Sequence, residues 1–249
     1  MSAKIPVLEI FGPTIQGEGA VIGKKTVFVR TAGCDYSCAW CDSKFTWDGS
    51  AKHQIRMLSP EEVCQEIFSL AGDSFNHVTI SGGNPALIGP QMRELLIRLH
   101  NRGVKVGLET QGSRWQDWFL LVDDLTISPK PPSSGMRTDW GILRYIVEKL
   151  AGYCDMAEEA YNFNLKVVVF DRDDYEFAKQ VHREFPEVPM FLSAGNSDVT
   201  PNASKAELRD SILTKLDWLA SKVMNDPAMN EVRVLPQLHV LLWGNQRGV

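Results

Sequence analysis

The sequence predicts an α/β fold, built as a partial (β/α)-type barrel of mainly parallel strands. Short runs rich in β-branched residues alternate with segments of helical periodicity, which is the pattern of βαβ units with parallel strands and right-handed crossovers. Polar residues follow several of the predicted strands, and barrel enzymes carry their sites at that edge. The 249 residues, 44% of them apolar, suit a single domain over residues 1–249.

The amino-terminal part is expected to form two strands, at residues 7–11 and 25–31, joined through a loop of turn-forming residues at 12–19. The second strand leads directly into a loop at residues 32–43. Polar residues in an arbitrary loop are most often solvated or paired at the surface. Here the loop at 12–19 and the end of the second strand adjoin residues 32–43, so we expect three polar side chains near that loop: Gln16, Glu18 and Arg30.

Three cysteines stand at a CxxxCxxC spacing in this loop, and we call them the three loop cysteines: Cys34, Cys38 and Cys41. Thiolates this close can gather on one metal centre, but three of them leave a four-iron cluster one protein ligand short. An iron without a protein ligand can chelate a small molecule. A structural zinc site and three unrelated buried cysteines are the alternatives. Zinc knuckles usually need a second ligand pair, and the nearest histidine, His53, has no partner beside it.

The middle of the chain continues the alternation. A capping box over residues 59–62, with a proline at the first helical position, predicts the start of an amphipathic helix. A strand at 77–81 ends in Gly82-Gly83-Asn84-Pro85, a turn that connects strand to helix and also permits close backbone approach to a ligand. A helix at 91–102, with Gly103 as its C-cap, and a strand at 104–109 follow.

Polar residues next follow two strand ends, at 108–112 and 126–132, where Glu109 and Lys130 either face a site or pair with a neighbouring loop. The second half is expected to hold strands at 165–170, 190–193 and 232–235 and helices at 173–185 and 204–224. Ser204 and Glu207 predict a second capping box. The tail from residue 235 is unusually apolar for a terminus. We expect it to dock and to place Gln237, His239 or the terminal carboxylate near the barrel mouth.

Charge and cysteine content narrow the functional classes. Lys and Arg total 26 against 31 Asp and Glu, and no basic block is present, so no direct nucleic-acid surface is expected. No apolar run reaches the roughly 18 residues of a membrane span, and no signal-peptide core begins the chain. A cytoplasmic location is expected, where thiols stay reduced. We expect Cys64, in a helix, and Cys154, in a polar stretch, to be structural.

The CxxxCxxC spacing is the signature of the radical S-adenosylmethionine superfamily, which the chain resembles at this point. Further segments resemble the 7-carboxy-7-deazaguanine synthase family along the whole chain: Glu9-Ile10-Phe11, Gln16-Gly17-Glu18-Gly19, Val27-Phe28-Val29-Arg30, Cys41-Asp42-Ser43, Leu108-Glu109-Thr110-Gln111-Gly112, Ile127-Ser128-Pro129-Lys130 and Gln237-Leu238-His239. The resemblance implies a radical-mediated ring contraction of 6-carboxy-5,6,7,8-tetrahydropterin to 7-carboxy-7-deazaguanine. This lyase reaction releases ammonia and belongs to queuosine biosynthesis.

The resemblance also implies cofactors and partners. A 4Fe–4S cluster would be held by the three loop cysteines, with S-adenosylmethionine on the open iron. Mg2+ would be held by Ser43, where the family usually has Thr, and Mg2+ commonly takes only one or two protein ligands. The alternative is that Ser43 merely caps a turn. An electron donor such as a flavodoxin or ferredoxin would be needed, and a homodimer is expected by analogy.

Site residues are carried over from the resemblance position by position. Those expected to contact S-adenosylmethionine are Trp40, Cys41, Asp42, Gly83, Asn84, Glu109, Ser128, Pro129 and Lys130. Those expected to contact the pterin are Ile15, Gln16, Gly17, Glu18, Arg30, Ser81 and His239, with Arg30, Glu18 and Gln16 as the catalytic set. The family usually has Glu at the position of Asn84, whose amide brings no charge. Arg30 is expected to clamp the pterin carboxylate with two parallel hydrogen bonds.

Two rival functions stay open on the sequence alone. Glycyl-radical-enzyme activases share the CxxxCxxC spacing and act on a protein partner. The polar loop at 16–18 together with Arg30 favours a small anionic substrate instead. The second rival function is a non-enzymatic zinc-binding module. Metal analysis after anaerobic purification distinguishes such a module from an iron enzyme.

Overall fold

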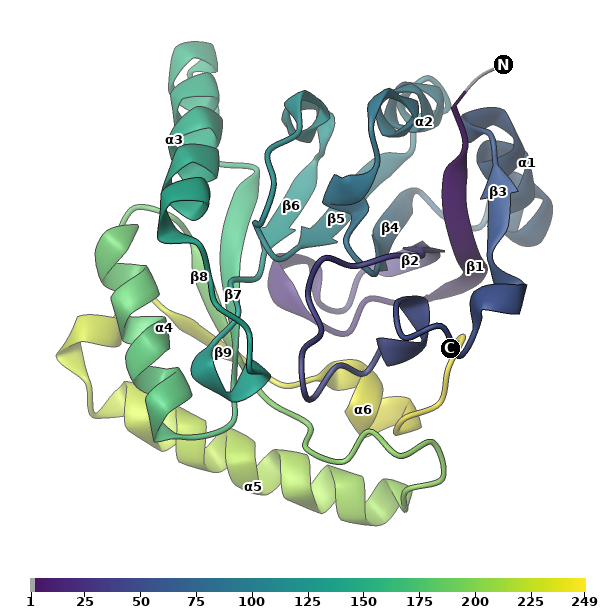
Figure 1. Cartoon of the computed structure of the whole chain (residues 1–249). Helices are drawn as coiled ribbons and strands as arrows, with labels where there is room; N and C mark the ends of the chain where they lie inside the picture. Colours follow the sequence, from purple (N-terminus) through teal and green to yellow (C-terminus); the bar gives the residue numbers. More distant parts are fainter. Residues whose placement is uncertain (1–2) are drawn as a thin grey trace.

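The computed structural model describes residues 3–249, and within that range nine strands form one curved sheet in the order β3-β1-β2-β4-β5-β6-β7-β8-β9 (Figure 1). From β2 to β9 neighbouring strands run parallel, while β1 pairs antiparallel with β2 and β3. The predicted α/β fold with mainly parallel strands is confirmed. The strands are β1 Ile5–Ile15, β2 Lys25–Thr31, β3 Arg56–Leu58, β4 His77–Gly82, β5 Lys105–Thr110, β6 Asp124–Ile127, β7 Phe163–Val169, β8 Met190–Ala194 and β9 Arg233–Leu235.

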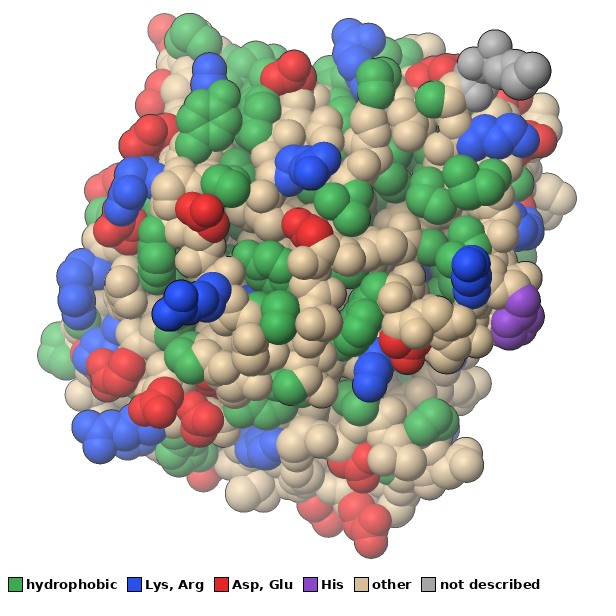
Figure 2. All heavy atoms as spheres, in the orientation of Figure 1, with side chains coloured by type: hydrophobic (Ala, Val, Ile, Leu, Met, Phe, Trp, Pro, Cys, Tyr) green, Lys and Arg blue, Asp and Glu red, His purple; other side chains and the backbone are tan. Residues whose placement is uncertain are grey.

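Helices α1 to α5 lie around the outside of the curved sheet, and the short α6 lies toward its interior (Figure 1). The helices are α1 Pro60–Ala71, α2 Pro90–His100, α3 Trp140–Ala157, α4 Arg172–Glu184, α5 Lys205–Met224 and α6 Leu238–Trp243. Short 3-10 turns occur at Gly19–Val21, Lys44–Thr46, Lys52–Gln54, Pro85–Leu87, Asp117–Leu121, Pro132–Ser134 and Pro227–Met229. No helix within residues 3–249 is long and apolar enough to cross a membrane. Figure 2 shows basic and acidic side chains interspersed over the visible face.

Of the two predicted capping boxes, one is complete and the other is half formed. At α1 the predicted capping box is complete, because Ser59 Oγ accepts from the Glu62 N–H at 3.2 Å and the Glu62 carboxylate accepts from the Ser59 N–H at 2.6 Å. At α5 only half of the predicted box forms: Ser204 Oγ accepts from the Glu207 N–H at 3.5 Å. Gly103 does not cap α2, which ends at His100 and has Asn101 as its C-cap.

The largest element that the sequence reasoning missed is α3. Its buried residues recur at helical spacing, and Asp139 caps its start by accepting from the Ile142 N–H at 3.0 Å. Cys154, expected in a polar stretch, instead lies buried on the inner face of this helix. The apolar periodicity and the capping aspartate can both be read in the sequence, but they follow a Pro-rich loop and were not recognised as the start of a helix.

Each parallel strand sends alternate side chains to opposite faces. In β2, Val27 and Val29 are fully buried against the helices, whereas Phe28 and Arg30 face the barrel interior. In β7, Lys166 stands among apolar neighbours and also faces that interior. The outward residues of the strands and the inner faces of α1 to α4 form one continuous apolar core. Period-two alternation therefore separates a hydrophobic outer layer from a polar interior.

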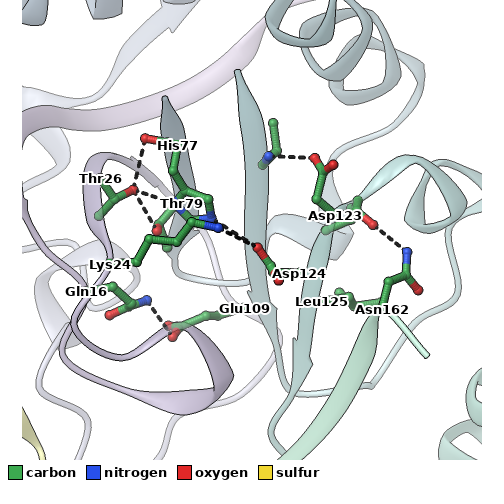
Figure 3. Close-up of polar contacts among 12 residues, drawn as sticks. Gln16, Lys24, Thr26, His77, Thr79, Glu109, Asp123, Asp124, Leu125 and Asn162 are labelled. Carbon is green, nitrogen blue, oxygen red and sulfur yellow. Dashed lines mark hydrogen bonds and ion pairs between the residues drawn. The ribbon is translucent and has the colours of Figure 1, made fainter. Parts of the chain in front are cut away.

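A buried polar network joins the amino ends of the parallel strands, below the interior (Figure 3). His77 Nδ1 lies 2.9 Å from Thr26 Oγ1, and His77 Nε2 lies 3.4 Å from the Asp124 carboxylate, which also binds Lys24 at 3.2 Å. Gly107 leaves room for the imidazole, because a Cβ there would lie 2.9 Å from His77 Cε1. We call these groups the barrel floor.

Candidate active site

A cavity of about 270 Å³ opens at the carboxyl edge of the parallel strands. Its wall combines the ends of β1, β2, β4, β5, β6 and β7 with residues 34–43 and the carboxyl-terminal segment. Strands that are distant in sequence thus deliver their terminal polar residues to one place, as in other barrels of parallel strands.

The structure brings nearly all of the predicted site residues to this one cavity. The residues that line it are Ile15, Gln16, Gly17, Glu18, Arg30, Cys34, Cys38, Trp40, Cys41, Asp42, Ser43, Ser81, Gly83, Glu109, Ser128, Lys130 and His239. Two predicted residues, Asn84 and Pro129, are not part of its lining. Asn84 is 1% exposed and its side chain contacts other protein groups. The roles of the lining residues remain proposals.

The three loop cysteines face the cavity as free thiols with N–H donors around them. The Tyr36 N–H lies 3.4 Å from Cys34 Sγ, and the Trp47 indole N–H lies 3.4 Å from Cys41 Sγ. Burial raises the pKa of all three thiols, that of Cys41 to about 11, so the metal-free loop cysteines are neutral. A bound metal deprotonates such thiols outright.

Within residues 3–249 no three His, Cys, Asp or Glu side chains converge as ligands of one ion. The fit to a four-iron cluster does not require that convergence, because each thiolate binds a different iron. Three thiols in one cavity, with N–H donors at the sulfurs of Cys34 and Cys41, match that ligand set.

A buried ion pair forms another part of the cavity wall. Lys166 Nζ bonds to the Glu18 carboxylate and lies 3.6 Å from Glu109 Oε1, while its side chain is only 5% exposed. Gln237 Nε2 donates to Glu18 Oε1 at 2.5 Å, and Gln16 Nε2 donates to Glu109 Oε1 at 3.2 Å (Figure 3). The sequence reasoning missed Lys166, although a lone lysine inside an apolar strand is a signal, since buried lysine is rare unless paired.

The charges of this wall are set by their mutual contacts. Burial alone would raise the pKa of Glu18, but the opposite charge of Lys166, together with His239 and the hydrogen bonds to Lys166 and Gln237, lowers it to about 2. Burial would lower the pKa of Lys166, yet Glu109 and Glu18 raise it above its ordinary value. The wall therefore presents the ionised carboxylate of Glu18, and Glu109 adds a second acceptor to the cavity.

Arg30 contacts two other side chains of the protein, Glu9 and Ser43. Its Nε lies 2.9 Å from Glu9 Oε1, and its Nη1 donates to Ser43 Oγ at 2.8 Å. Arg247 Nε donates to the other oxygen of Glu9 at 2.7 Å. The antiparallel register of β1 and β2 sets Glu9 opposite Arg30. The Nε and Nη1 groups of Arg30 are thus engaged within the protein, and its role as a clamp for the pterin carboxylate stays a prediction.

Lys130 and Trp40 border the cavity on the side of the second and third loop cysteines. Lys130 Nζ lies 5.8 Å from the centre of the Trp40 ring and donates to Ser128 Oγ at 3.2 Å. Trp40 Nε1 donates to Ser133 Oγ at 2.9 Å, which ties the loop to the segment after β6. Burial lowers the pKa of Lys130. This side offers a cation close to the thiols.

The carboxyl-terminal segment closes the cavity next to Gly17. The Leu238 N–H donates to the Gly17 carbonyl at 3.0 Å. His239 packs so closely that a Cβ on Gly17 would lie 2.7 Å from the His239 backbone nitrogen. Only glycine fits there, so residues 17 and 239 hold each other at the cavity edge.

Comparisons with known proteins identify the family. Residues 28–128 match the model of the radical SAM superfamily, which implies a 4Fe–4S cluster and S-adenosylmethionine. The chain is 56% identical to a 7-carboxy-7-deazaguanine synthase of Bacillus cereus, over 99% of this chain and 100% of the relative. It is 54% identical to that of Bacillus subtilis, over the full length of both. The crystal structure of QueE from Escherichia coli shares the fold, with a TM-score of 0.61 at 21% identity over 95% of each chain. The chain therefore belongs to the 7-carboxy-7-deazaguanine synthase family.

Proposed function

We propose that this protein contracts the ring of 6-carboxy-5,6,7,8-tetrahydropterin to 7-carboxy-7-deazaguanine, a carbon–nitrogen lyase reaction that releases ammonia on the route to queuosine. One observation carries the proposal. A single cavity is lined by the three loop cysteines, by the ion pair of Glu18 and Lys166 with Glu109 beside it, and by Arg30. A cluster site and a polar small-molecule site therefore share one space, as the relatives' activity requires.

The cluster side would be built by residues 34–43. When bound, the reduced cluster cleaves S-adenosylmethionine and supplies the radical that removes hydrogen from the pterin. The three loop cysteines would hold three irons, and the Trp47 indole stabilises the Cys41 thiolate by its N–H. Lys130, close to Cys38 and Cys41, places a positive charge beside the anionic cluster. Gly83 and Ser128 supply polar groups for the cofactor.

The pterin side would be built by the wall that holds the ion pair. Glu18 is held ionised by Lys166, so its oxygens accept hydrogen bonds from ring N–H groups of the substrate. Arg30 and His239 lie on the same cavity and offer donors to the substrate carboxylate. Because the side chains of Glu18 and Lys166 are buried, hydrogen bonds to them are stronger than at the surface.

Mg2+ is proposed to bind at Ser43, next to Asp42. The Ser43 hydroxyl donates to Asp42 Oδ1 at 3.0 Å and accepts from Arg30. A hydroxyl oxygen beside a carboxylate suits a hard cation that keeps several waters. The test is Mg2+ titration of product formation in Ser43→Ala, with Ser43→Thr as the matched control. Ser43→Ala should need far more Mg2+, whereas an unchanged Mg2+ requirement would remove Ser43 from the metal site.

An external electron donor, a flavodoxin or ferredoxin, and assembly as a homodimer complete the proposal. The reaction needs one electron from outside the chain to begin, which supports a donor of this kind. Sedimentation of the purified protein tests the dimer.

The decisive experiment is anaerobic reconstitution with iron and sulfide, followed by incubation with the pterin and mass analysis of the products. About four irons per chain and the deazaguanine product support the proposal. Stoichiometric zinc without iron would support a binding module instead. Cleavage of S-adenosylmethionine that the pterin does not stimulate would favour an activase.

A further inference from the structure

The side chain of Asn84 is used entirely within the protein. Its Oδ1 accepts from Thr110 Oγ1 at 2.8 Å and from the Ala86 N–H at 3.2 Å. Its Nδ2 donates to Asp35 Oδ1 at 2.9 Å and to Ser113 Oγ at 3.0 Å. An asparagine amide has two N–H donors and two acceptor lone pairs, so these four contacts fill it. Asn84 therefore has no free group to offer a ligand.

Asp35, the residue that follows the first loop cysteine, accepts hydrogen bonds from two further side chains besides Asn84. Its carboxylate also accepts from Gln111 Nε2 at 2.5 Å and from Ser113 Oγ at 2.7 Å. The same Gln111 amide lies 3.6 Å from Cys34 Sγ. Residues that follow β4 and β5 thus hold the neighbour of the first cluster ligand by three hydrogen bonds.

Two backbone hydrogen bonds also connect the turn after β4 to the segment after β2. The Gly83 N–H donates to the Thr31 carbonyl at 3.0 Å, and the Asn84 N–H donates to the Gly33 carbonyl at 2.7 Å. These bonds extend the parallel pairing of β2 with β4 beyond both strands. A Cβ on Gly83 would overlap the Gly33 carbonyl, so glycine is required for this approach.

We propose that Asn84 is a positioning residue that latches the cluster loop through Asp35, instead of contacting S-adenosylmethionine. The amide donates where the carboxylate accepts, so the two residues are a matched pair. A glutamate at position 84 would set a second carboxylate against Asp35 in place of the amide donor, and like charges repel at such distances. The latch forms in the metal-free chain, and only its effect on cluster binding rests on the proposed function.

The test uses Asn84→Asp, Asp35→Asn and the double exchange, studied first without metal. Amide hydrogen exchange of residues 33–38 reports opening of the loop. Asn84→Asp should speed this exchange by about 10- to 100-fold, because a hydrogen bond to a charged group is replaced by repulsion. Exchange in α1 should not change. Asn202→Asp, on an exposed loop residue, makes the same chemical change elsewhere and should leave exchange at wild-type rates.

The double variant distinguishes a latch from a general structural role. It swaps the amide and the carboxylate between positions 35 and 84, so one N–H donor still faces one carboxylate. The Gln111 amide, which donates to Asp35 in the wild type, has to turn over to accept from the new amide. Amide exchange should then return to within a few-fold of wild type. Iron content after reconstitution and the absorption of the bound cluster should fall in Asn84→Asp and recover in the double variant. Slower loop opening in the double variant than in either single variant supports the latch, and simple addition of the two effects overturns it.

Other outcomes are equally decisive. Unchanged exchange in Asn84→Asp, with weakened S-adenosylmethionine binding after reconstitution, would make Asn84 a direct ligand contact and refute the latch. If Asn84→Asp does not fold by circular dichroism, Asp35→Ala on the exposed side of the pair carries the same exchange prediction. Because the exchange needs no metal, normal loop protection in a wild-type protein that forms no product would refute the proposed function alone.

Discussion

Replacing Lys166 with Met removes the ammonium group that lies between two carboxylates in the cavity wall. Methionine has a similar length and no charge, so the strand keeps a side chain of nearly the same volume. Glu18 and Glu109 then remain in a buried site without their cation. Removing one partner of a buried ion pair is strongly destabilising, because the other charge stays desolvated.

The magnitude follows from the carboxylate. The pKa of Glu18 is lowered from 4.5 to about 2, and its side chain is 13% exposed. At about 1.36 kcal/mol per pKa unit this corresponds to about 3 kcal/mol, within the range of about 3–5 kcal/mol for breaking a buried pair. For a protein of this size, about 3 kcal/mol lowers the melting temperature by about 6–12 °C.

The assay is urea unfolding and thermal melting of the metal-free protein at pH 7. Lys24→Met is the matched control, since Lys24 pairs with Asp124 at 3.2 Å but is 34% exposed, and such pairs contribute about 0–1 kcal/mol. Glu18→Gln added to Lys166→Met should restore part of the loss. Because the pKa of Glu18 is lowered in the folded state, its contribution is present above pH 4.5 and disappears as the pH falls toward 2. The difference between wild type and Lys166→Met should shrink over that interval.

A loss in Lys166→Met no larger than in Lys24→Met would refute this reasoning. It would mean that water or a rearranged side chain compensates the buried carboxylates. A loss that stays constant down to pH 2 would instead show that Glu18 is not the group involved.

Three further predictions concern the cavity and the barrel floor. Replacing any one of the three loop cysteines with Ala should abolish reductive cleavage of S-adenosylmethionine, whereas Cys64→Ala and Cys154→Ala should keep it; normal 5′-deoxyadenosine formation in a loop variant would overturn the cluster assignment. Arg30→Lys should keep the cluster and substrate-independent cleavage but lose on the order of 10²-fold in product formation, since misplacement by about 1 Å has such an effect; equal loss of both activities would make Arg30 structural. Asp124→Asn should lower the melting temperature at pH 7, and the deficit should shrink as the pH falls below 3.8 and through the lowered pKa of Asp124, because the contact with His77 lowers that pKa and its contribution is lost there; a deficit that does not change with pH would contradict the link.

Local chemistry is enough to find several elements from the sequence. The strand expected at 25–31 has the bounds of β2, and the capping box marks the start of α1. These features depend on residues at most a few positions apart, so they can be recognised from the sequence without knowing the fold. The CxxxCxxC spacing is another local feature of this sort, because all three cysteines lie within one loop. The boundaries of the later elements differ from the expected ones by one or two residues, where competing caps and turns decide the ends.

The partners of the polar site residues were decided only by the tertiary structure. Lys166 meets Glu18 across 148 positions of sequence, and Asn84 meets Asp35 across 49. Arg30 is held by Glu9 because β1 folds back antiparallel onto β2 in one register. The sequence pattern assigns each of these residues to a strand or to the loop that follows one. Which charge lies opposite which depends on strand order and register, and those are set by the packing of the whole sheet against its helices, where a one-residue slip would turn every side chain to the other face.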